Sequence, residues 1–289
     1  MVTWFESPAD AVKRLADVGY LADDDTATTV FLAGVLGKPL LVEGPAGVGK
    51  TELAKAVTAA ADAALVRLQC YEGLDEARAL YEWNYKKQLL RIQAAGAQAW
   101  EETHDDIFSE EFLLTRPLLT AIRREDPTVL LVDEVDKTDV EVEGLLLEVL
   151  SDFQVTIPEL GTVVATRRPF VVLTSNASRE LSEALKRRCL YLHLDYPDAD
   201  REKAIVLSQV PEAGERLVEQ LVEMVGRLRE LELKKAPSIA ESVDWARTLL
   251  ALDAGHLDAD VAARTLGVVL KHVSDQERAT KELRLARTS

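Results

Sequence analysis

The stretch KPLLVEGPAGVGKT, residues 38–51, decides the fold of this chain. It starts as an apolar run, typical of a strand inside a parallel sheet, and turns through glycines into an alanine-rich helix. GPAGVGKT matches the pattern G-x-x-x-x-G-K-[ST], and a preceding strand and a following helix are the context that this pattern requires. The stretch therefore predicts a phosphate-binding loop. The alternative is a plain glycine-rich turn between a strand and a helix.

The residue types in this loop suit a nucleotide. Its glycines let successive backbone N–H groups point at an anion, and the helix that follows adds the positive end of its dipole. Lys50 can reach the β- and γ-phosphates, and the Thr51 hydroxyl can ligate Mg²⁺. We therefore predict ATP and Mg²⁺ as cofactors. The predicted nucleotide contacts are Gly44, Pro45, Ala46, Gly47, Val48, Gly49, Lys50, Thr51 and Glu52.

Two acids follow directly after the apolar run of TVLLVDEVD. Asp133 would lie at the carboxyl end of the sheet, where open α/β folds bind ligands, and could hold Mg²⁺ opposite Thr51. Glu134 points differently and could act on the attacking water. A solvated loop is the alternative for the pair. Asp136 and Asp139 are predicted to cap the helix that follows.

A second apolar strand, in PFVVLTSNASREL, ends in Ser175 and Asn176. Next to the Asp133 strand, the Asn176 amide could hydrogen-bond the γ-phosphate or hold the attacking water. The alternative is an Asx-turn into the next helix.

Strands that alternate with helices predict an α/β domain with a mostly parallel sheet, residues 1–197, followed by an all-helical domain, residues 198–289. A hairpin is expected between residues 154 and 169, where two β-favouring runs flank a turn. Strands are expected at residues 38–43, 64–68, 129–132, 170–174 and 190–194, and helices at residues 50–61, 74–97 with a possible break, 113–124 and 140–153.

The bulk composition narrows the class of protein. The net charge of −16 gives an acidic surface that repels phosphate backbones, so nucleic-acid binding is disfavoured. Cys70 and Cys189 form no CxxC pair, and the four histidines lack metal-ligand spacing. No apolar run approaches the roughly 18 residues of a membrane span, and no signal peptide is evident. A soluble, cytoplasmic protein with reduced thiols is expected.

Taken in order, the loop at residues 44–51, the pair Asp133 and Glu134, Asn176 and LKRRC at residues 185–189 resemble an AAA+ ATPase, whose lid would be the helical tail. LLEVLSDFQVTIPELGTVVATRRPFVVLTSN is similar to the MoxR group, and RLQCYEGLDEARALYEWNYKKQLLRIQ to its CoxD-like subgroup.

The resemblance implies further roles. Asn176 would be the first sensor, and Arg188, with Arg187 as the alternative, would reach into the neighbouring subunit's site. The group commonly has an arginine after a proline at the start of a lid helix, but Ser238 occupies that position here. The second sensor would be absent, or supplied by Lys235 or Arg247.

The resemblance also implies a function: Mg²⁺-dependent ATP hydrolysis by a ring, expected to be a hexamer, that remodels a protein client. The CoxD-like subgroup points to a client among molybdenum hydroxylases of the carbon-monoxide dehydrogenase type, and to a von Willebrand factor A domain adaptor. Two alternatives are a nucleotide-dependent assembly switch with little turnover and a DNA-directed AAA+ motor, which the acidic charge disfavours.

An aromatic cluster lies in the block assigned to the subgroup: Tyr71, Tyr81, Trp83 and Tyr85. Its last three members lie two residues apart, which suits an extended segment with one aromatic face. The cluster would either anchor a protein partner or pack in the core.

Overall fold

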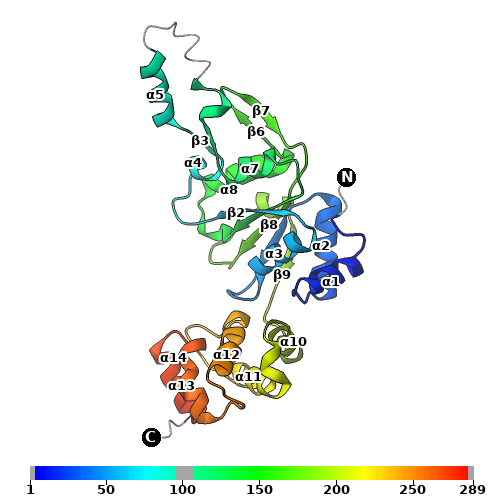
Figure 1. Ribbon diagram of the computed structural model, residues 1–289, viewed down its shortest axis with the longest axis vertical. Helices are drawn as coiled ribbons and strands as arrows, with labels where there is room; N and C mark the ends of the chain where they lie inside the picture. The colour runs from blue at the N-terminus through cyan, green and yellow to red at the C-terminus, as the bar shows by residue number, and fades with distance from the viewer. Residues whose placement is uncertain (1–3, 96–106, 286–289) are drawn as a thin grey trace. The chain divides into compact units, whose positions relative to one another are not determined.

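The computed structural model of the chain describes residues 4–95 and 107–285 (Figure 1). These residues form two compact units. The first unit comprises Met1–Val18, Ala22–Glu43 and Thr51–His193, and the second comprises Gly19–Leu21, Gly44–Lys50 and Leu194–Ser289. Within the two described ranges, no helix has the length and apolar character needed to span a membrane.

The first unit is built on a five-stranded parallel sheet with the strand order β2-β5-β8-β1-β9. The strands are β1 (Leu40–Glu43), β2 (Ala64–Gln69), β5 (Thr128–Asp133), β8 (Phe170–Ser175) and β9 (Leu190–His193). Every residue of β5 and β8 is buried, as expected for central strands covered on both faces. The predicted α/β fold with a parallel sheet is therefore confirmed.

Helices α7 (Pro117–Arg123) and α8 (Val140–Asp152) contribute to one apolar core that includes alternate strand residues such as Leu130 and Val132. Since side chains alternate across a strand, Asp133 points to the opposite face of the sheet. Asp139 caps α8 by accepting hydrogen bonds from Glu141 N and Val142 N, as predicted.

Three helices come early in the chain: α1 (Pro8–Asp17), α2 (Asp24–Leu36) and α3 (Lys50–Ala60). Ser7 caps α1 by accepting a 3.1 Å hydrogen bond from Asp10 N, and Asp23 caps α2 in the same way. Gly37 ends α2 in the left-handed conformation that glycine favours. Helix α3 begins at the lysine of the glycine-rich motif, where the sequence predicts it.

The expected helices at residues 74–97 and 113–124 are wrong in part. Residues 81–83 interrupt the first expected helix, which fits its possible break, and residues 113–115 replace the start of the second; the two segments pair as antiparallel strands. Residues 96–97 lie outside the described residues. Pro117 explains the second error, because a proline suits the first turn of a helix and favours an extended residue before it. The elements observed here are α4 (Glu76–Ala79), β3 (Tyr81–Trp83), α5 (Tyr85–Ala95), η1 (Glu110–Phe112) and β4 (Leu113–Thr115).

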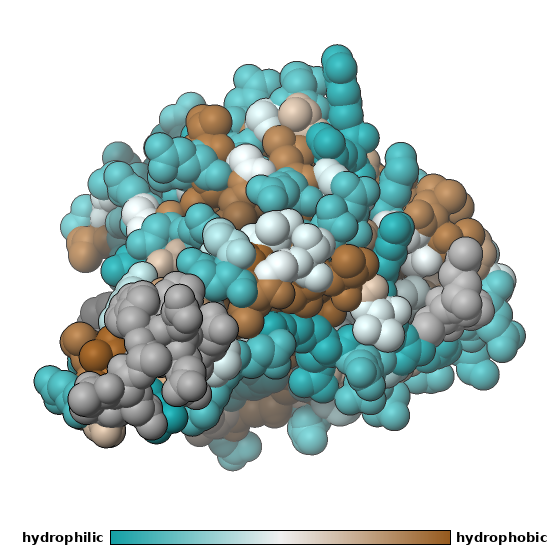
Figure 2. All heavy atoms as spheres, turned by 90° about the horizontal axis from the view of Figure 1, so that it is seen from above, coloured by the Kyte–Doolittle hydropathy of each residue, from teal (hydrophilic) through white to brown (hydrophobic). Residues whose placement is uncertain are grey.

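The aromatic cluster divides into buried and exposed members. Trp83 is 8% exposed and belongs to the apolar core, and Tyr81 packs against that core. Tyr71 and Tyr85 are exposed, and on α5 Leu89 and Leu90 are exposed with them. Figure 2 shows hydrophobic side chains in small groups between hydrophilic ones over the face it displays. The core-packing alternative thus holds for Trp83, while a partner contact stays a prediction for the exposed residues.

The expected hairpin is confirmed as β6 (Gln154–Ile157) and β7 (Gly161–Val164). After β8 comes the short helix α9 (Glu183–Arg188), capped by Ser182. Glu143 of α8 is 1% exposed and accepts a 2.9 Å hydrogen bond from Ser182 N. Burial raises the pKa of Glu143, but the bonds from Ser182 and Arg179 outweigh it, so the pKa lies below its ordinary value. This anchored carboxylate fixes the start of α9.

The C-terminal part of the second unit is helical, as predicted. Its core surrounds the fully buried Trp245, whose indole N–H donates a 2.8 Å hydrogen bond to Thr265 Oγ1. The buried carboxylate of Glu202 accepts from Arg229 and from Ser242 Oγ, which joins three helices. The elements are α10 (Ala199–Gln209), η3 (Pro211–Ala213), α11 (Gly214–Arg229), α12 (Ile239–Ala251), α13 (Ala259–Val269) and α14 (Val273–Glu282).

Candidate active site

A row of polar side chains crosses the carboxyl end of the sheet. The register pairs Gln69 of β2 with Asp133 of β5, and it places Thr174 of β8 beside Asp133 on the other side. Neighbours in register on parallel strands share one face, so these three side chains lie together on the face opposite the α7–α8 core. This edge of the sheet is where open α/β folds bind ligands.

Asp133 is 2% exposed, and three side chains donate to its carboxylate. Thr51 Oγ1, from the first turn of α3, donates to Oδ1 at 2.9 Å, and Thr174 Oγ1 donates to the same oxygen at 2.6 Å. Arg67 Nη2 donates to Oδ2 at 2.5 Å. The structure thus brings Thr51 and Asp133 together, and these are the two residues that the sequence expects to hold Mg²⁺.

The hydroxyl and carboxylate at this point fit Mg²⁺, which prefers hard oxygen ligands. Among the described residues, no group of three or more His, Cys, Asp and Glu side chains could hold a metal ion alone. Mg²⁺ usually keeps several waters and uses one or two carboxylates together with substrate phosphates. Thr51 and Asp133 are the residues that would hold it.

Glu134 follows Asp133 in a left-handed backbone conformation with φ 60°, which is uncommon for a residue with a side chain. Its backbone N–H donates to Thr174 Oγ1 at 2.9 Å, so one threonine hydroxyl contacts both acids. The Glu134 carboxylate accepts hydrogen bonds from Gln69 at 2.9 Å and from Lys137 at 2.7 Å.

Asn176 lies just after β8 and reaches the same carboxylate. Its Nδ2 is 3.4 Å from Glu134 Oε1. The adjacent turn is held by Asp136, which accepts from Ser178 N at 3.0 Å and Ser178 Oγ at 2.5 Å. The expectation that Asp136 caps the next helix is therefore wrong: Asp136 lies in the short 3-10 helix η2 (Val135–Lys137), and its carboxylate binds the loop that carries Asn176.

The pKa of Asp136 reflects this contact. Burial raises it, but hydrogen bonds from Ser178 and from the Asn176 backbone outweigh burial and leave the pKa below its ordinary value. The charged form of Asp136 is thus the one that holds the loop after β8.

The glycine-rich loop belongs to the second unit and runs directly into α3. Lys50 is 6% exposed, and its Nζ donates to Gly44 O and Pro45 O, both at 2.7 Å. Gly44 and Gly47 have φ of 154° and 79°, and a Cβ on Gly44 would meet Leu194 O at 1.9 Å. These two positions accept only glycine. Glu52 instead faces solvent, where it pairs with Lys55 at 2.6 Å.

Ser238 caps α12 in a capping box with Glu241. A Cβ on Gly47 would lie 2.3 Å from the Ser238 Cβ, so the serine stands against the loop where the resemblance expects an arginine. Lys235 Nζ lies 3.4 Å from Glu241, and Arg247 lies 3.4 Å from Asp244. Both cations are thus paired on the surface of α12, and the second sensor stays a prediction.

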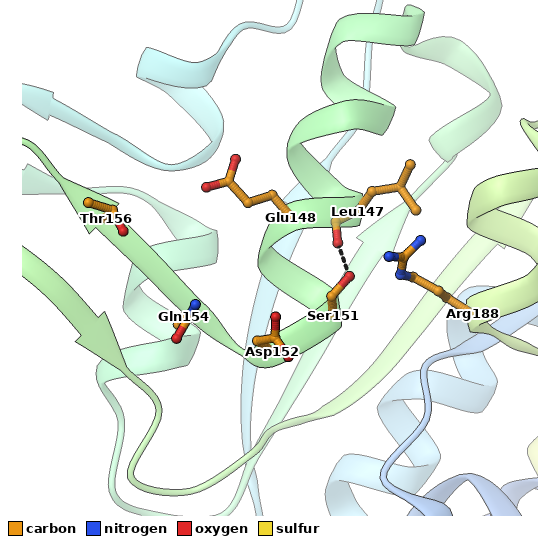
Figure 3. A pocket seen from close by; sticks show the side chains of 7 residues that line it. All are labelled: Leu147, Glu148, Ser151, Asp152, Gln154, Thr156 and Arg188. Atoms are coloured by element: carbon orange, nitrogen blue, oxygen red, sulfur yellow. Dashed lines mark hydrogen bonds between the residues drawn. The ribbon is translucent and has the colours of Figure 1, made fainter.

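Arg187 and Arg188 end α9, and both are exposed. Arg188 lines a cavity of about 330 Å³, and Figure 3 shows its guanidinium extending toward the end of α8. The other lining residues are Leu147, Glu148, Ser151, Asp152, Gln154 and Thr156. This cavity is separate from the Thr51–Asp133 contact.

Sequence reasoning missed three members of the site: Arg67, Gln69 and Thr174. Thr174 is a buried hydroxyl at the polar end of a strand whose first four residues are apolar, which is a signal that could have identified it. Arg67 and Gln69 alternate with Val66 and Leu68, so the sequence predicts that they share one face of their strand. It does not predict that this face contacts Asp133 and Glu134.

A family model described as an AAA domain of the dynein-related subfamily matches residues 39–189. An uncharacterized protein of Staphylococcus aureus strain USA300 is 28% identical over 224 residues, which cover 75% of this chain and 77% of that protein. A protein of the bovine strain RF122 / ET3-1 matches equally well, at 28% identity. Among solved structures, a mutant of Thermotoga maritima RuvB has a TM-score of 0.51 at 18% identity, covering 86% of this chain and 69% of that one.

Proposed function

Because the chain belongs to the AAA domain family, dynein-related subfamily, we propose that it binds ATP with Mg²⁺ and hydrolyses it to ADP and phosphate. The observation that carries the proposal is the 2.9 Å contact between the Thr51 hydroxyl and the buried Asp133 carboxylate. Thr51 is the last residue of the glycine-rich motif, and Asp133 ends β5. The hydroxyl and the carboxylate that hold ATP-bound Mg²⁺ in phosphate-binding-loop enzymes thus lie next to each other.

The loop binds the triphosphate through the backbone of Gly44, Gly47 and Gly49. Lys50 exchanges its contacts with the carbonyls of Gly44 and Pro45 for contacts with phosphate oxygens. Mg²⁺, when bound by Thr51 and Asp133, supplies positive charge to the β- and γ-phosphates.

Glu134 serves as the base that orients and deprotonates the attacking water. Its carboxylate is 32% exposed and lies one residue beyond Asp133, so it can reach a water at the site's edge. Asn176 contacts this carboxylate and positions the same water or the γ-phosphate. Thr174 is a positioning residue, because its hydroxyl bonds both the Asp133 side chain and the Glu134 backbone.

The chain works as a ring, for which we propose six copies. Arg188, or Arg187 beside it, reaches the site of the neighbouring subunit and neutralises charge on the transferred phosphoryl. Its exposure at the end of α9 supports such a role, because a side chain that acts on another subunit must be accessible. Ser182 and Glu143 hold that helix in place.

The ring remodels a protein client in the cytoplasm. The sequence resemblance to the CoxD-like subgroup of MoxR proteins supports a client among molybdenum hydroxylases of the carbon-monoxide dehydrogenase type, with a von Willebrand factor A domain protein as adaptor. The exposed Tyr85, Leu89 and Leu90 of α5 are the residues proposed to contact the client or adaptor.

Nucleotide binding and turnover test the core of this proposal. Lys50→Ala should lose ATP binding, whereas Lys55→Ala, one turn later on the exposed side of α3, should keep it. Glu134→Gln should bind ATP without hydrolysing it, with Glu141→Gln as the matched control on α8. Unchanged ATP affinity in Lys50→Ala would remove the loop assignment.

Turnover also separates ATPase action from the alternative, a nucleotide-dependent switch that scarcely hydrolyses. A wild-type rate no higher than that of Glu134→Gln would favour the switch. The client is tested by purifying Glu134→Gln with ATP from native lysate. Recovery of a molybdenum hydroxylase, absent with Lys50→Ala, supports maturation, and its absence from both removes this client.

A further inference from the structure

Arg67 lies on β2, the edge strand next to β5, and it reaches the site from the side opposite Thr51. Because Arg67 and Gln69 are two residues apart, they share the face of the sheet that carries Asp133. The Arg67 side chain is 47% exposed, while that of Asp133 is 3% exposed. The Arg67 side chain is therefore partly in solvent while its guanidinium contacts a buried carboxylate.

The two oxygens of the Asp133 carboxylate accept hydrogen bonds from different kinds of donor. Oδ1 accepts from the neutral hydroxyls of Thr51 and Thr174. Oδ2 accepts from Arg67 Nη2 at 2.5 Å, a charge-assisted contact. Arg67 Nη2 also donates to Gln69 Oε1, so the guanidinium is held by a second residue of its own strand.

A divalent ion and Arg67 make competing demands on this carboxylate. Arginine keeps its charge in proteins, so it cannot yield the position by losing a proton. A cation beside Mg²⁺ repels it, and water screens this repulsion only in part, because Arg67 is 47% exposed while the carboxylate that both cations contact is buried. The ion can gain full access to Asp133 only as the guanidinium moves toward solvent, where about half of its side chain already lies.

Resting on the proposed ATP and Mg²⁺ site, we propose that Arg67 is an internal counter-cation of Asp133 that a divalent ion must displace. It neutralises the buried carboxylate when no ion is bound, and it lowers the affinity of the nucleotide site for Mg²⁺. Arg67 is thus a positioning residue that sets the Mg²⁺ concentration at which the site fills.

The test measures metal binding rather than turnover. Full-length protein is mixed with a fluorescent ADP analogue, and Mg²⁺ is titrated until the fluorescence change saturates. Arg67→Gln should lower the Mg²⁺ concentration at half-saturation by about three- to tenfold, since it removes one charge-assisted contact and one repelling charge. Arg124→Gln is the matched control: it removes one charge near the opposite end of β5, where Arg124 pairs with Asp126, and should leave the midpoint unchanged.

Stability without metal gives a second readout. In EDTA, Arg67→Gln should unfold at lower urea concentration than wild type, because Asp133 loses its counter-ion, and Mg²⁺ with ADP should shrink this difference. Arg67→Lys keeps the charge and should hold the Mg²⁺ midpoint within about twofold of wild type. If Arg67→Gln does not fold, the Arg67→Lys variant tests the proposal. A Mg²⁺ midpoint for Arg67→Lys clearly below that of wild type would overturn it, because the positive charge is still present.

The outcomes separate this proposal from the proposed function. If wild type binds the ADP analogue with no response to Mg²⁺, both fail. If wild type responds and Arg67→Gln matches it or needs more Mg²⁺, Arg67 does not compete with the ion, and only the counter-cation proposal is overturned. The same titration can be made with Mn²⁺, whose binding is measured by the loss of the electron paramagnetic resonance signal of the free ion. The half-saturation concentrations of the variants should fall in the same order as with Mg²⁺.

Discussion

Thr174→Val tests whether one hydroxyl supports both acids. Thr174 is 1% exposed, and its Oγ1 donates to Asp133 Oδ1 at 2.6 Å while accepting from Glu134 N at 2.9 Å. Valine has nearly the same shape as threonine, so the change removes the two hydrogen bonds without opening a cavity.

The expected loss follows from these two bonds. A hydrogen bond to a charged group contributes about 1.5–3 kcal/mol and a neutral one about 1 kcal/mol, and both remaining partners are buried or partly buried. Thr174→Val should therefore lower the free energy of unfolding by about 3 kcal/mol. Thr58→Val is the control, because the hydroxyl of Thr58 bonds only the carbonyl of Ala54 within its own helix.

The assay is urea unfolding followed by far-UV circular dichroism and by tryptophan fluorescence, with midpoints compared at equal slope. Two probes are needed because the chain has two compact units that can unfold separately. Thr174→Ser should recover most of the loss, since it restores the hydroxyl. The reasoning is refuted if Thr174→Val lies within about 0.5 kcal/mol of Thr58→Val.

Two further predictions concern Arg188 and Asp136. Arg188→Ala should bind ATP but hydrolyse it about 10³-fold more slowly or worse, and mixing it with Lys50→Ala subunits should restore activity in a steady-state assay; no recovery would argue against action between subunits. Because the folded-state pKa of Asp136 is lowered, its contribution to stability is present above the pKa of the unfolded carboxyl, near 4, and is lost as the pH falls through the lower folded-state value. Asp136→Asn should therefore flatten the loss of urea resistance on acidification below about pH 4, and an unchanged pH profile would contradict the assignment.

Much of the fold was predictable because its signals are local. The central strands are continuous apolar runs, and the glycine-rich motif marks where β1 ends and α3 begins. The antiparallel pairing of β3 with β4 was not predictable, because it joins Trp83 to Leu113 across a long stretch of sequence. Helix-favouring residues around it suggested helices, and the long-range pairing overrode that preference.

The candidate site divides in a similar way. Thr51 and Asp133 come from motifs with fixed spacing, so their meeting could be expected from the order of a parallel sheet. The contacts of Arg67 and Gln69 could not, because they depend on β2 being the direct neighbour of β5. Asp136 shows the same limit: its place after a strand suggested a helix cap, but the loop that follows β8 supplies Ser178 as its partner.

The backbone of Glu134 has a practical consequence for making inactive forms of the protein. A left-handed conformation costs most residues about 1–2 kcal/mol, while asparagine adopts it readily. Asparagine at this position would remove the carboxylate proposed to act on the attacking water and would also relieve the backbone, whereas glutamine retains the penalty. Glu134→Asn should therefore give an inactive form with a less strained backbone than Glu134→Gln.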